Sequence, residues 1–357
     1  MKDTYCVILA GGAGERLWPL SSYVRPKQLI PFINGTSLLE QTVQRVQAIE
    51  KNKNHLIVMT NADLQDPVKK LVGKQTTVLT EPMGRNTGPA ILLSCLEIYS
   101  KNEDAVVVIV PSDHFIPETE KVTSLLLAAS AYASCYEQIV LLGIRPTTPA
   151  TGYGYVQYAT DLTPGWACFP ISKFHEKPDK EQAQQYLEQG DMLWNSGIFV
   201  GRAKVFLDQF QQWAPELWSA VAAYRAHELA YDHVPSISID HAVLEKSNSM
   251  VVFPAHFEWH DVGTLPAFLM LKAHHEKESA ATQVINVDAH NNLACASKKV
   301  VAFVGVDNLC VVETDEALLV VAHDRVEAVR DVSSLLKAKE DRNAGHSKST
   351  VVAEDSL

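Results

Sequence analysis

A glycine-rich stretch near the start of the chain carries the residue types best suited to bind phosphate. It reads LAGGAGERLWPLSSYVRPKQ from Leu9 to Gln28 and follows a short apolar run that predicts a buried strand. Three glycines let the backbone turn and approach a ligand without a Cβ in the way. Backbone N–H groups followed by Arg16 and Lys27 supply what a polyphosphate requires. The three glycines are Gly11, Gly12 and Gly14.

Two familiar phosphate-binding loops do not fit this stretch. The dinucleotide pattern G-x-G-x-x-G fails because the sixth position counted from Gly12 is Leu17. The Walker A pattern fails because no Gly-Lys-Ser/Thr follows the glycines. A phosphate loop of a different class is therefore predicted.

A second polar loop, EPMGRNTGPA, runs from Glu81 to Ala90. Its proline and glycine residues predict a loop, and Pro89 fits the first turn of a following helix. A carboxylate such as Glu81 can accept hydrogen bonds from the N1–H and amino groups of guanine, with Arg85 and Asn86 close by in the sequence. The alternative is a polar loop that only caps the helix.

Two aspartates are candidate metal ligands. Asp113 follows Ser112 and the apolar run Val106–Val110, at the end of a predicted parallel strand, where open α/β sheets bind ligands. Mg²⁺ prefers one or two carboxylates together with phosphate oxygens. Asp261, in the segment EWHDVG, is the candidate second ligand. The alternative for Asp113 is a cap on the next helix.

Four further segments could face a sugar phosphate. Each is weak evidence alone, since Glu176 and Lys177, for instance, could form an ordinary surface pair. The segments are GYGY at 152–155, FHEKP at 174–178, WNSGIF at 194–199 and SID at 238–240.

Together these segments resemble a known enzyme family. GGxGxRLxPL…PKQ resembles the signature of the sugar-1-phosphate nucleotidyltransferases. The second loop resembles the E-P-x-G-R-N-T-A-P-A motif of the mannose-1-phosphate guanylyltransferases and departs from it only at Gly88. The family blocks G-Y-G-Y, F-x-E-K-P, W-N-S-G-x-F and S-I-D-x-A-V-x-E-K follow in the same order. The usual D-V-G-S-W reads DVGTL here, which keeps the aspartate and the glycine. The resemblance runs from about residue 4 to 335.

The resemblance implies a reaction, a cofactor and a set of roles. The reaction is GTP plus mannose 1-phosphate giving GDP-mannose and pyrophosphate. Mg²⁺ would be held by Asp113 and Asp261, and the catalytic cations would be Arg16, Lys27 and Lys177. The sugar-binding residues would be Gly154, Glu176, Asn195 and Asp240. The nucleotide-binding residues would be Leu9, Gly11, Gly12, Gly14, Glu81, Arg85, Asn86 and Ser112. A homodimer is also expected.

Two other functions stay open at this point. The first is a thymidylyl- or uridylyltransferase acting on glucose 1-phosphate, which the EPxGRNT loop disfavours. The second is a non-catalytic relative that binds nucleotide sugars and regulates a partner. Such a protein would be expected to have lost a metal aspartate or a phosphate-binding cation, whereas this chain keeps them all.

The pattern of elements predicts the fold class. Strand-like and helical segments alternate through about residue 144, which indicates a Rossmann-like α/β domain with a mostly parallel sheet. Residues 1–280 are expected to form this nucleotidyltransferase domain. The β-rich stretch 281–335 resembles the small left-handed β-helix of the family. Residues 336–357 are expected to contain a helix end and a disordered tail.

Several elements are predicted individually. Ser37 and Glu40 form a capping box that predicts the start of a helix. Helices are also predicted near 180–189 and 203–213 and over 332–339, and a short strand is predicted at 198–201.

Composition narrows the classes of function. The 357 residues carry a net charge of −11, which argues against a general nucleic-acid binder. No apolar run is long enough to span a membrane, and the N-terminus lacks the layout of a signal peptide. Six scattered cysteines without a C-x-x-C pattern favour reduced thiols in a cytoplasmic protein.

Overall fold

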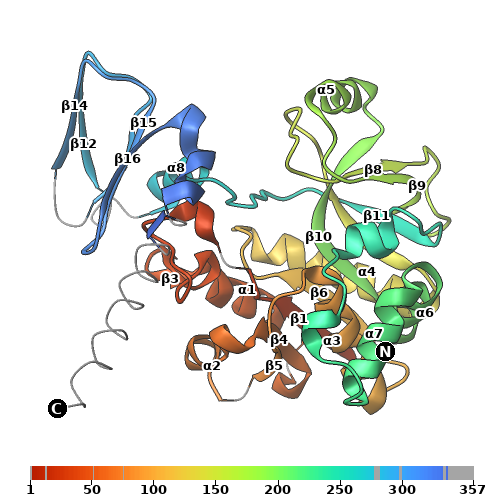
Figure 1. Ribbon diagram of the computed structural model, residues 1–357. Helices are drawn as coiled ribbons and strands as arrows, with labels where there is room; N and C mark the ends of the chain where they lie inside the picture. Colours follow the sequence, from red (N-terminus) through yellow and green to blue (C-terminus); the bar gives the residue numbers. More distant parts are fainter. Residues whose placement is uncertain are drawn as a thin grey trace, which may run out of the picture. The chain divides into compact units, whose positions relative to one another are not determined.

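The computed structural model forms two compact units (Figure 1). It describes residues 2–12, 14–50, 52–74, 76–276, 282–296, 300–332 and 335–336. The first unit comprises Met1–Gly11 and Leu39–Asp261, and the second comprises Gly12–Leu38 and Val262–Leu357.

The first unit is built on a nine-stranded sheet with strand order β5-β4-β1-β6-β10-β7-β11-β9-β8. Its strands are β1 (Thr4–Leu9), β4 (Leu56–Asn61), β5 (Thr77–Glu81), β6 (Val106–Pro111), β7 (Ile139–Ile144), β8 (Tyr155–Tyr158), β9 (Phe169–His175), β10 (Met192–Arg202) and β11 (Met250–Ala255).

The sheet is mixed, with two parallel groups. Strands β5, β4, β1 and β6 pair in parallel, as do β7 and β11. The long strand β10 lies between the groups and runs antiparallel to both β6 and β7, and β8 and β9 add antiparallel pairs. Parallel pairing was predicted, whereas the insertion of β10 was not. A strand buried on both faces has the same apolar pattern whichever way it runs.

Helices cover the sheet on both faces. On one face α3, α6 and α7 pack together over Val7, Val107 and Ile109, which are fully buried. Val108, which points to the other face, is also fully buried. Helix α4 packs against β6, β7, β10 and β11. The helices are α1 (Leu38–Gln47), α2 (Gln65–Val72), α3 (Thr87–Lys101), α4 (Thr119–Cys135), α5 (Lys180–Gln189), α6 (Ala203–Trp213) and α7 (Pro215–Arg225), with a π-helix at Asp240–Leu244.

Strong sequence signals for helices predict the helix limits that the structure shows. The capping-box pair Ser37 and Glu40 predicts the start of α1, which begins at Leu38. The predicted limits of α5 and α6 agree with the structure. Helices α2 and α7 were not predicted.

The second unit contains a hairpin, a helix and short strands. Phe32 of the hairpin and Phe268 of the helix lie with ring centroids 4.7 Å apart. Lys272 Nζ donates a hydrogen bond of 2.8 Å to the backbone oxygen of Phe32, which fixes the hairpin against the helix. The elements are β2 (Pro31–Ile33), β3 (Thr36–Ser37), α8 (Leu265–His275), β12 (Gln283–Val287), β13 (Leu293–Cys295), β14 (Val300–Val304), β15 (Leu309–Glu313) and β16 (Leu318–Ala322).

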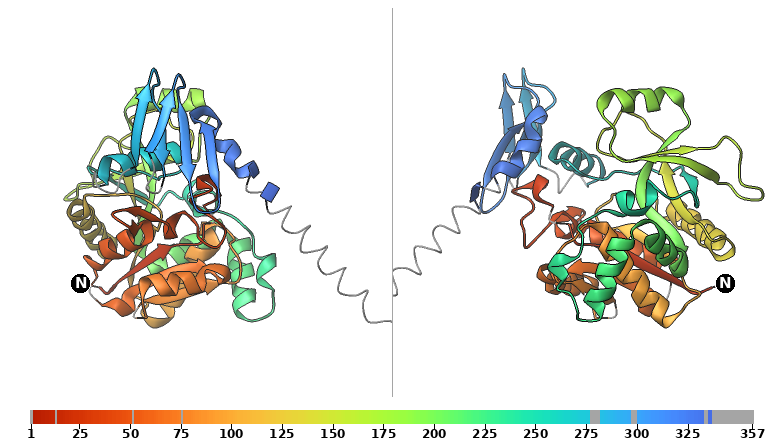
Figure 2. Two further views of the ribbon diagram at one scale, coloured as in Figure 1. Left: turned by 90° about the vertical axis from the view of Figure 1, so that its left-hand side faces the viewer. Right: turned by 45° about the vertical axis from the view of Figure 1, so that its right-hand side comes forward.

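The C-terminal strands pair across the intervening strand. Strand β12 pairs with β14 and β13 pairs with β15, both in parallel, and β16 runs antiparallel to β15. Figure 2 shows these strands side by side, in blue. Parallel pairing of strands that are not consecutive is expected when a chain winds in successive coils. The predicted helix over 332–339 and the predicted disordered tail lie largely outside the described residues.

Within the described part of the chain, no helix has the length and apolarity needed to cross a membrane. The six cysteines are free thiols, and four of them are buried.

Candidate active site

The carboxyl ends of β1, β5 and β6 bring three predicted segments to one edge of the sheet. Leu9 ends β1, Glu81 ends β5, and Ser112 follows β6. The Ser112 backbone N–H donates a hydrogen bond of 3.1 Å to the Leu9 oxygen. Gly11 lies close to Glu81, because a Cβ on Gly11 would be 3.6 Å from Glu81 Oε1. This edge is where ligands bind in open α/β sheets.

Glu81 is a buried carboxylate with a dedicated partner. Its exposed fraction is 3%, and the Tyr231 hydroxyl donates to Glu81 Oε2 over 2.5 Å. Burial raises the pKa of Glu81 to about 7, although the bonds from Tyr231 and from the Arg85 backbone act in the opposite direction. A carboxyl group that titrates near neutral pH is unusual for structure alone and is common at functional sites.

Arg85 and Asn86 have structural contacts in addition to their predicted roles. Arg85 Nη2 donates to the backbone oxygen of Asp232. The Asn86 side-chain oxygen accepts from the Thr87 N–H at 2.8 Å, so it caps α3 as the alternative proposed. Asn86 adopts a φ of +69° with a ψ of −173°, which is a strained backbone conformation for any residue other than glycine. Nucleotide binding by both residues stays a prediction.

Gly88, the one departure within the second motif, is sterically required here. A Cβ at this position would lie 2.5 Å from the Ile237 oxygen and 3.3 Å from Leu217 Cδ2. The Gly88 N–H donates to the same Ile237 oxygen over 3.0 Å, which holds the backbones together. The apparently small difference from alanine is therefore not neutral in this chain.

We expect Gly88→Ala to destabilise the fold by about 1–3 kcal/mol, as for other overpacked sites. The reason is that the new methyl group must displace backbone rather than a flexible side chain. Urea unfolding of the variant measures this directly. Gly152→Ala is the matched control, because a Cβ at Gly152 meets nothing within 4 Å. Equal unfolding midpoints for the two variants would contradict the steric argument.

Asp113 and Asp261 lie on neighbouring segments. Phe115 and His260 form an isolated antiparallel bridge, with backbone hydrogen bonds of 2.9 and 3.0 Å. Asp113 therefore lies two residues before the bridge, and Asp261 one residue after it. Helix α4 begins only at Thr119, which excludes Asp113 as its cap.

Each of these two aspartates has a partner nearby, and that of Asp261 is within hydrogen-bonding distance. The Tyr153 hydroxyl donates to Asp261 Oδ1 over 2.9 Å. Trp259 Nε1 donates a hydrogen bond of 3.2 Å to His114 Nδ1. The other ring nitrogen, His114 Nε2, lies 3.9 Å from Asp113 Oδ1. The sequence indicated that GYGY could face a sugar phosphate but did not indicate that Tyr153 would contact Asp261.

Two aspartates on neighbouring segments are a suitable donor set for a magnesium ion that also binds phosphate oxygens. Such an ion takes one or two protein carboxylates and completes its shell with water and substrate oxygens. No group of three or more histidine, cysteine or acidic side chains that could hold a metal occurs among the described residues. An all-protein cage is therefore not formed in that part of the chain.

The predicted sugar-binding residues form one cluster. Glu176 Oε2 would lie 2.8 Å from a Cβ on Gly154, so this glycine makes room for the carboxylate. Lys177 Nζ pairs with Glu176 Oε1, and the Glu176 side chain is only 8% exposed. The Lys177 side chain is 61% exposed, so the sequence-based alternative of an ordinary surface pair stays open. Lys177 also adopts a left-handed φ of +43°, which is a strained conformation for this residue.

A bulge in β10 adds two more members to this cluster. The register of β10 shifts between Asn195 and Phe199, where Gly197 adopts a φ of +68°. Asn195 Nδ2 donates to Asp240 Oδ1 over 3.1 Å, and the Asn195 N–H donates to the Gly154 oxygen over 2.8 Å. Bulges often redirect a side chain at functional sites.

The buried Asp240 carboxyl lowers the stability of the folded protein when it is charged. Burial, assisted by the charge of Glu176, raises the pKa of Asp240 to about 6. A carboxyl whose pKa is raised in the folded state favours folding below its unfolded pKa. That contribution is lost as the pH rises through about 6.

Asp240→Asn should therefore stabilise the protein at pH 8 but not at pH 4. The amide keeps an acceptor for Asn195 and does not titrate. We expect the melting temperature of the variant minus that of wild type to increase by roughly 2–4 °C between pH 4 and pH 8. Differential scanning calorimetry at both pH values checks it. Asp208→Asn, at an exposed pair with Lys204, is the control. A pH-independent difference would refute the linkage.

The second unit contains the rest of the glycine-rich loop. Gly14 adopts a φ of +63°, and a Cβ there would lie 2.4 Å from the Lys27 backbone nitrogen. The Ser21 hydroxyl donates to the Gly14 oxygen over 2.5 Å, and Gln28 Nε2 donates to the Gly12 oxygen over 3.0 Å. The loop is thus folded back on itself around its glycines.

The two cations of this loop differ in exposure. Lys27 is buried at 7% exposure. Arg16 is half-exposed, and its Nε lies 3.8 Å from Glu327 Oε2 in the 3-10 helix His323–Ala328. An exposed pair at this distance contributes little to stability, so Arg16 can exchange partners readily.

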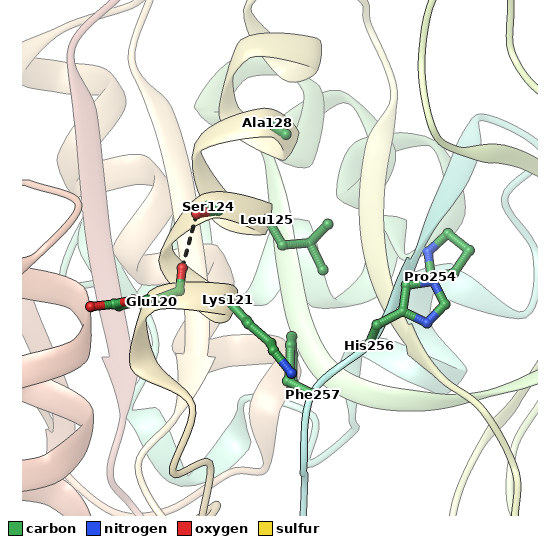
Figure 3. A pocket seen from close by; sticks show the side chains of 8 residues that line it. All are labelled: Glu120, Lys121, Ser124, Leu125, Ala128, Pro254, His256 and Phe257. Atoms are coloured by element: carbon green, nitrogen blue, oxygen red, sulfur yellow. Dashed lines mark hydrogen bonds between the residues drawn. The ribbon is translucent and has the colours of Figure 1, made fainter.

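A pocket of about 530 Å³ lies elsewhere in the first unit, beside α4 (Figure 3). Lys121 and Leu125 of the helix face it, together with His256 and Phe257, which follow β11. None of the predicted substrate or metal residues lines this pocket.

Comparison with known proteins identifies the family. A family model described as Nucleotidyl transferase matches residues 5–278, which is more than half of the chain. The chain belongs to the nucleotidyl transferase family. A second model, described as the MannoseP isomerase/GMP-like beta-helix domain, matches residues 282–336. The predicted α/β nucleotidyltransferase fold with a C-terminal β-helix module is thereby confirmed.

Curated relatives within the family match nearly the whole chain. The xanthan biosynthesis protein XanB of Xanthomonas campestris pv. campestris (strain B100) is 35% identical over 366 residues, covering 98% of this chain and 76% of that protein. The mannose-1-phosphate guanylyltransferase of Klebsiella pneumoniae is 33% identical, covering 93% of this chain and 73% of its own length. The family resemblance inferred from the motifs is confirmed.

A solved structure supports the same assignment. A protein from Thermus thermophilus, described as a mannose-1-phosphate geranyltransferase, superimposes with a TM-score of 0.84 at 30% identity. The match covers 94% of this chain and all of that chain. Nucleotidyltransferases of this kind generally use a divalent metal.

Proposed function

We propose that this nucleotidyltransferase transfers GMP from GTP to mannose 1-phosphate, giving GDP-mannose and pyrophosphate. The observation that carries the proposal is the buried carboxylate of Glu81 at the ligand-binding edge of the sheet. Guanine presents two adjacent donors, N1–H and the amino group, that match a carboxylate. Thymine and uracil present a single N–H flanked by carbonyl oxygens, which a carboxylate repels. Relatives named mannose-1-phosphate guanylyltransferase agree with this choice.

The chemistry requires alignment rather than a general base. A sugar phosphate has a second pKa near 6, so its attacking oxygen is largely deprotonated at neutral pH. That oxygen attacks the α-phosphorus of GTP, the bond from the α-phosphorus to the bridging oxygen breaks, and pyrophosphate leaves. The protein contributes by orienting the two phosphates and stabilising their charge.

The charged residues divide this work between the reacting groups. We assign Lys177 to the sugar phosphate, and Arg16 and Lys27 to the triphosphate, with the loop N–H groups of Gly11, Gly12 and Gly14. Asp113 and Asp261 would hold Mg²⁺, which neutralises phosphate charge when bound. Tyr153 orients Asp261 for this role.

The cluster of carboxylates and amide is assigned to the sugar hydroxyls. Glu176, Asn195 and Asp240 provide acceptors and one amide donor around Gly154. Carboxylates that retain charge in a partly buried position are suited to accept hydrogen bonds from hydroxyl groups.

A substrate panel tests the proposal. The purified chain is incubated with Mg²⁺, one of GTP, ATP, UTP or dTTP, and either mannose 1-phosphate or glucose 1-phosphate, and pyrophosphate release is measured. Release with GTP and mannose 1-phosphate alone is the expected result. A preference for dTTP or UTP with glucose 1-phosphate would overturn the base assignment. No release from a folded protein would favour the regulatory, non-catalytic alternative.

We further propose a cytoplasmic homodimer formed through the C-terminal strands. These strands expose a large number of apolar side chains for a small unit, which is typical of an interface. Sedimentation equilibrium should give twice the chain mass of 39.4 kDa, and Leu318→Lys with Val320→Lys should give the monomer. The exposed apolar residues of these strands are Ile285, Val287, Val300, Val304, Leu318 and Val320.

A further inference from the structure

We infer that Tyr231 is a positioning residue for guanine selection, because its hydroxyl holds the Glu81 carboxylate in the orientation that accepts from the base. This inference rests on the proposed function and adds to it a residue that lies 150 positions from Glu81 in the sequence. No sequence motif points to Tyr231.

The geometry divides the two carboxylate oxygens between two tasks. Tyr231 Oη lies 2.5 Å from Glu81 Oε2, and Tyr231 itself is 4% exposed. The other oxygen, Oε1, lies on the side of Gly11, where a Cβ would be 3.6 Å away. Because Tyr231 binds one oxygen, the other lies on the side of Gly11, in the glycine-rich loop assigned to the nucleotide.

Tyr231 belongs to segment 231–239, which makes several hydrogen bonds to the second motif, residues 81–90. Gly88 N–H donates to the Ile237 oxygen over 3.0 Å, and Ile239 N–H donates to the Thr87 hydroxyl over 3.0 Å. Arg85 donates to the oxygen of Asp232, the neighbour of Tyr231. Segment 231–239 therefore fixes the motif at both ends, and Tyr231 is the member whose side chain reaches Glu81.

The Tyr231 ring is itself held in place. Its centroid lies 4.7 Å from that of Tyr224 in α7, at an interplanar angle of 64°. This packing keeps the Tyr231 hydroxyl directed at Glu81. Tyr224 acts on the positioning residue through its ring, so the Tyr224 hydroxyl is not expected to affect the orientation of Glu81.

The same hydrogen bond influences when Glu81 is charged. The donated proton of Tyr231 stabilises the carboxylate and so lowers the pKa of Glu81, against the larger effect of burial. The other group that acts on this carboxyl is the Arg85 backbone, which also lowers its pKa. Loss of the Tyr231 hydroxyl should raise the pH at which Glu81 becomes charged, and with it the pH at which guanine binds well.

The test is Tyr231→Phe, with Tyr224→Phe as the matched control that deletes a hydroxyl from the neighbouring ring. Steady-state kcat and KM are measured with GTP and mannose 1-phosphate from pH 6 to pH 9. Tyr231→Phe should raise KM for GTP about tenfold, as expected for loss of a hydrogen bond to a charged group. Its KM should fall to a plateau at higher pH than in wild type. The kcat and the KM for mannose 1-phosphate should change less than twofold.

The design separates the carboxyl from other titrations and from misfolding. GTP titrates identically in all three proteins, so the ratio of variant to wild-type KM isolates Glu81. Site-specific replacement of Tyr231 by 3-fluorotyrosine keeps the ring and makes the hydroxyl a stronger donor, which should move the KM profile to lower pH. This second variant applies even if Tyr231→Phe does not fold.

Three results would decide the matter. A shifted pH profile for both Tyr231 variants, with Tyr224→Phe resembling wild type, supports the inference. Turnover of GTP by wild type with unchanged profiles in the Tyr231 variants would overturn this inference alone. Absence of turnover of GTP and mannose 1-phosphate by wild type would overturn the proposed function, and the inference with it.

Discussion

Asp113→Asn and Asp261→Asn should each lower kcat about a thousandfold while the fold is kept, a loss of about 4 kcal/mol in transition-state stabilisation. Asparagine has nearly the shape of aspartate but lacks its charge. The negative charge of the carboxylate would hold the divalent cation. A bound cation of this kind supplies several kcal/mol of transition-state stabilisation. The bridge between Phe115 and His260 involves backbone atoms only, so neither substitution removes it.

The experiment measures metal binding as well as catalytic activity. Electron paramagnetic resonance of Mn²⁺ with the protein and GTP reports metal affinity directly, and we expect it to weaken in both variants. Asp208→Asn, which changes an exposed partner of Lys204, is the control for loss of one negative charge. Near wild-type kcat at saturating Mg²⁺ in either variant would show that this aspartate is not a metal ligand.

Short sequence patterns predicted the helices and strands whose formation depends on residues close together in the sequence. The capping pair Ser37 and Glu40 located the start of α1, and apolar runs located the parallel strands. Strand β10 was predicted only at Ile198–Gly201, although it begins at Met192. The reason is that its first half contains Asn195 and Gly197, which form a bulge and break the alternation.

The contacts that organise the candidate site join distant segments. Tyr231 is 150 residues from Glu81, and Tyr153 is 108 residues from Asp261. The residue types alone suggested what Glu81 and Asp261 could do, but not which hydroxyl would orient each of them. The requirement for glycine at position 88 likewise depends on the Ile237 oxygen, which only the folded chain brings near. Such partners follow from tertiary packing and leave no local pattern.

Glu81→Gln should abolish the preference for GTP over ATP. The Tyr231 hydroxyl donates to the carboxyl in wild type, so we expect the new amide to direct its oxygen at Tyr231 and its NH₂ group toward the base. A donor then faces the two donors of guanine. We expect kcat/KM for GTP to fall by about 10²–10³, since a mismatched buried polar group discriminates strongly. Adenine offers an acceptor at N1 beside its amino group, so ATP should lose far less than GTP.

The same variant removes a pH dependence. In wild type the pKa of Glu81 is raised to about 7 by burial, so KM for GTP should increase as the pH falls below neutrality. In Glu81→Gln the KM ratio of GTP to ATP should be constant from pH 6 to pH 9, because both nucleotides share one triphosphate titration. Inosine triphosphate, which lacks the amino group, completes the panel. A GTP preference that survives in the variant would show that another residue recognises the base. A preference that disappears together with its pH dependence would assign both to this single buried carboxylate.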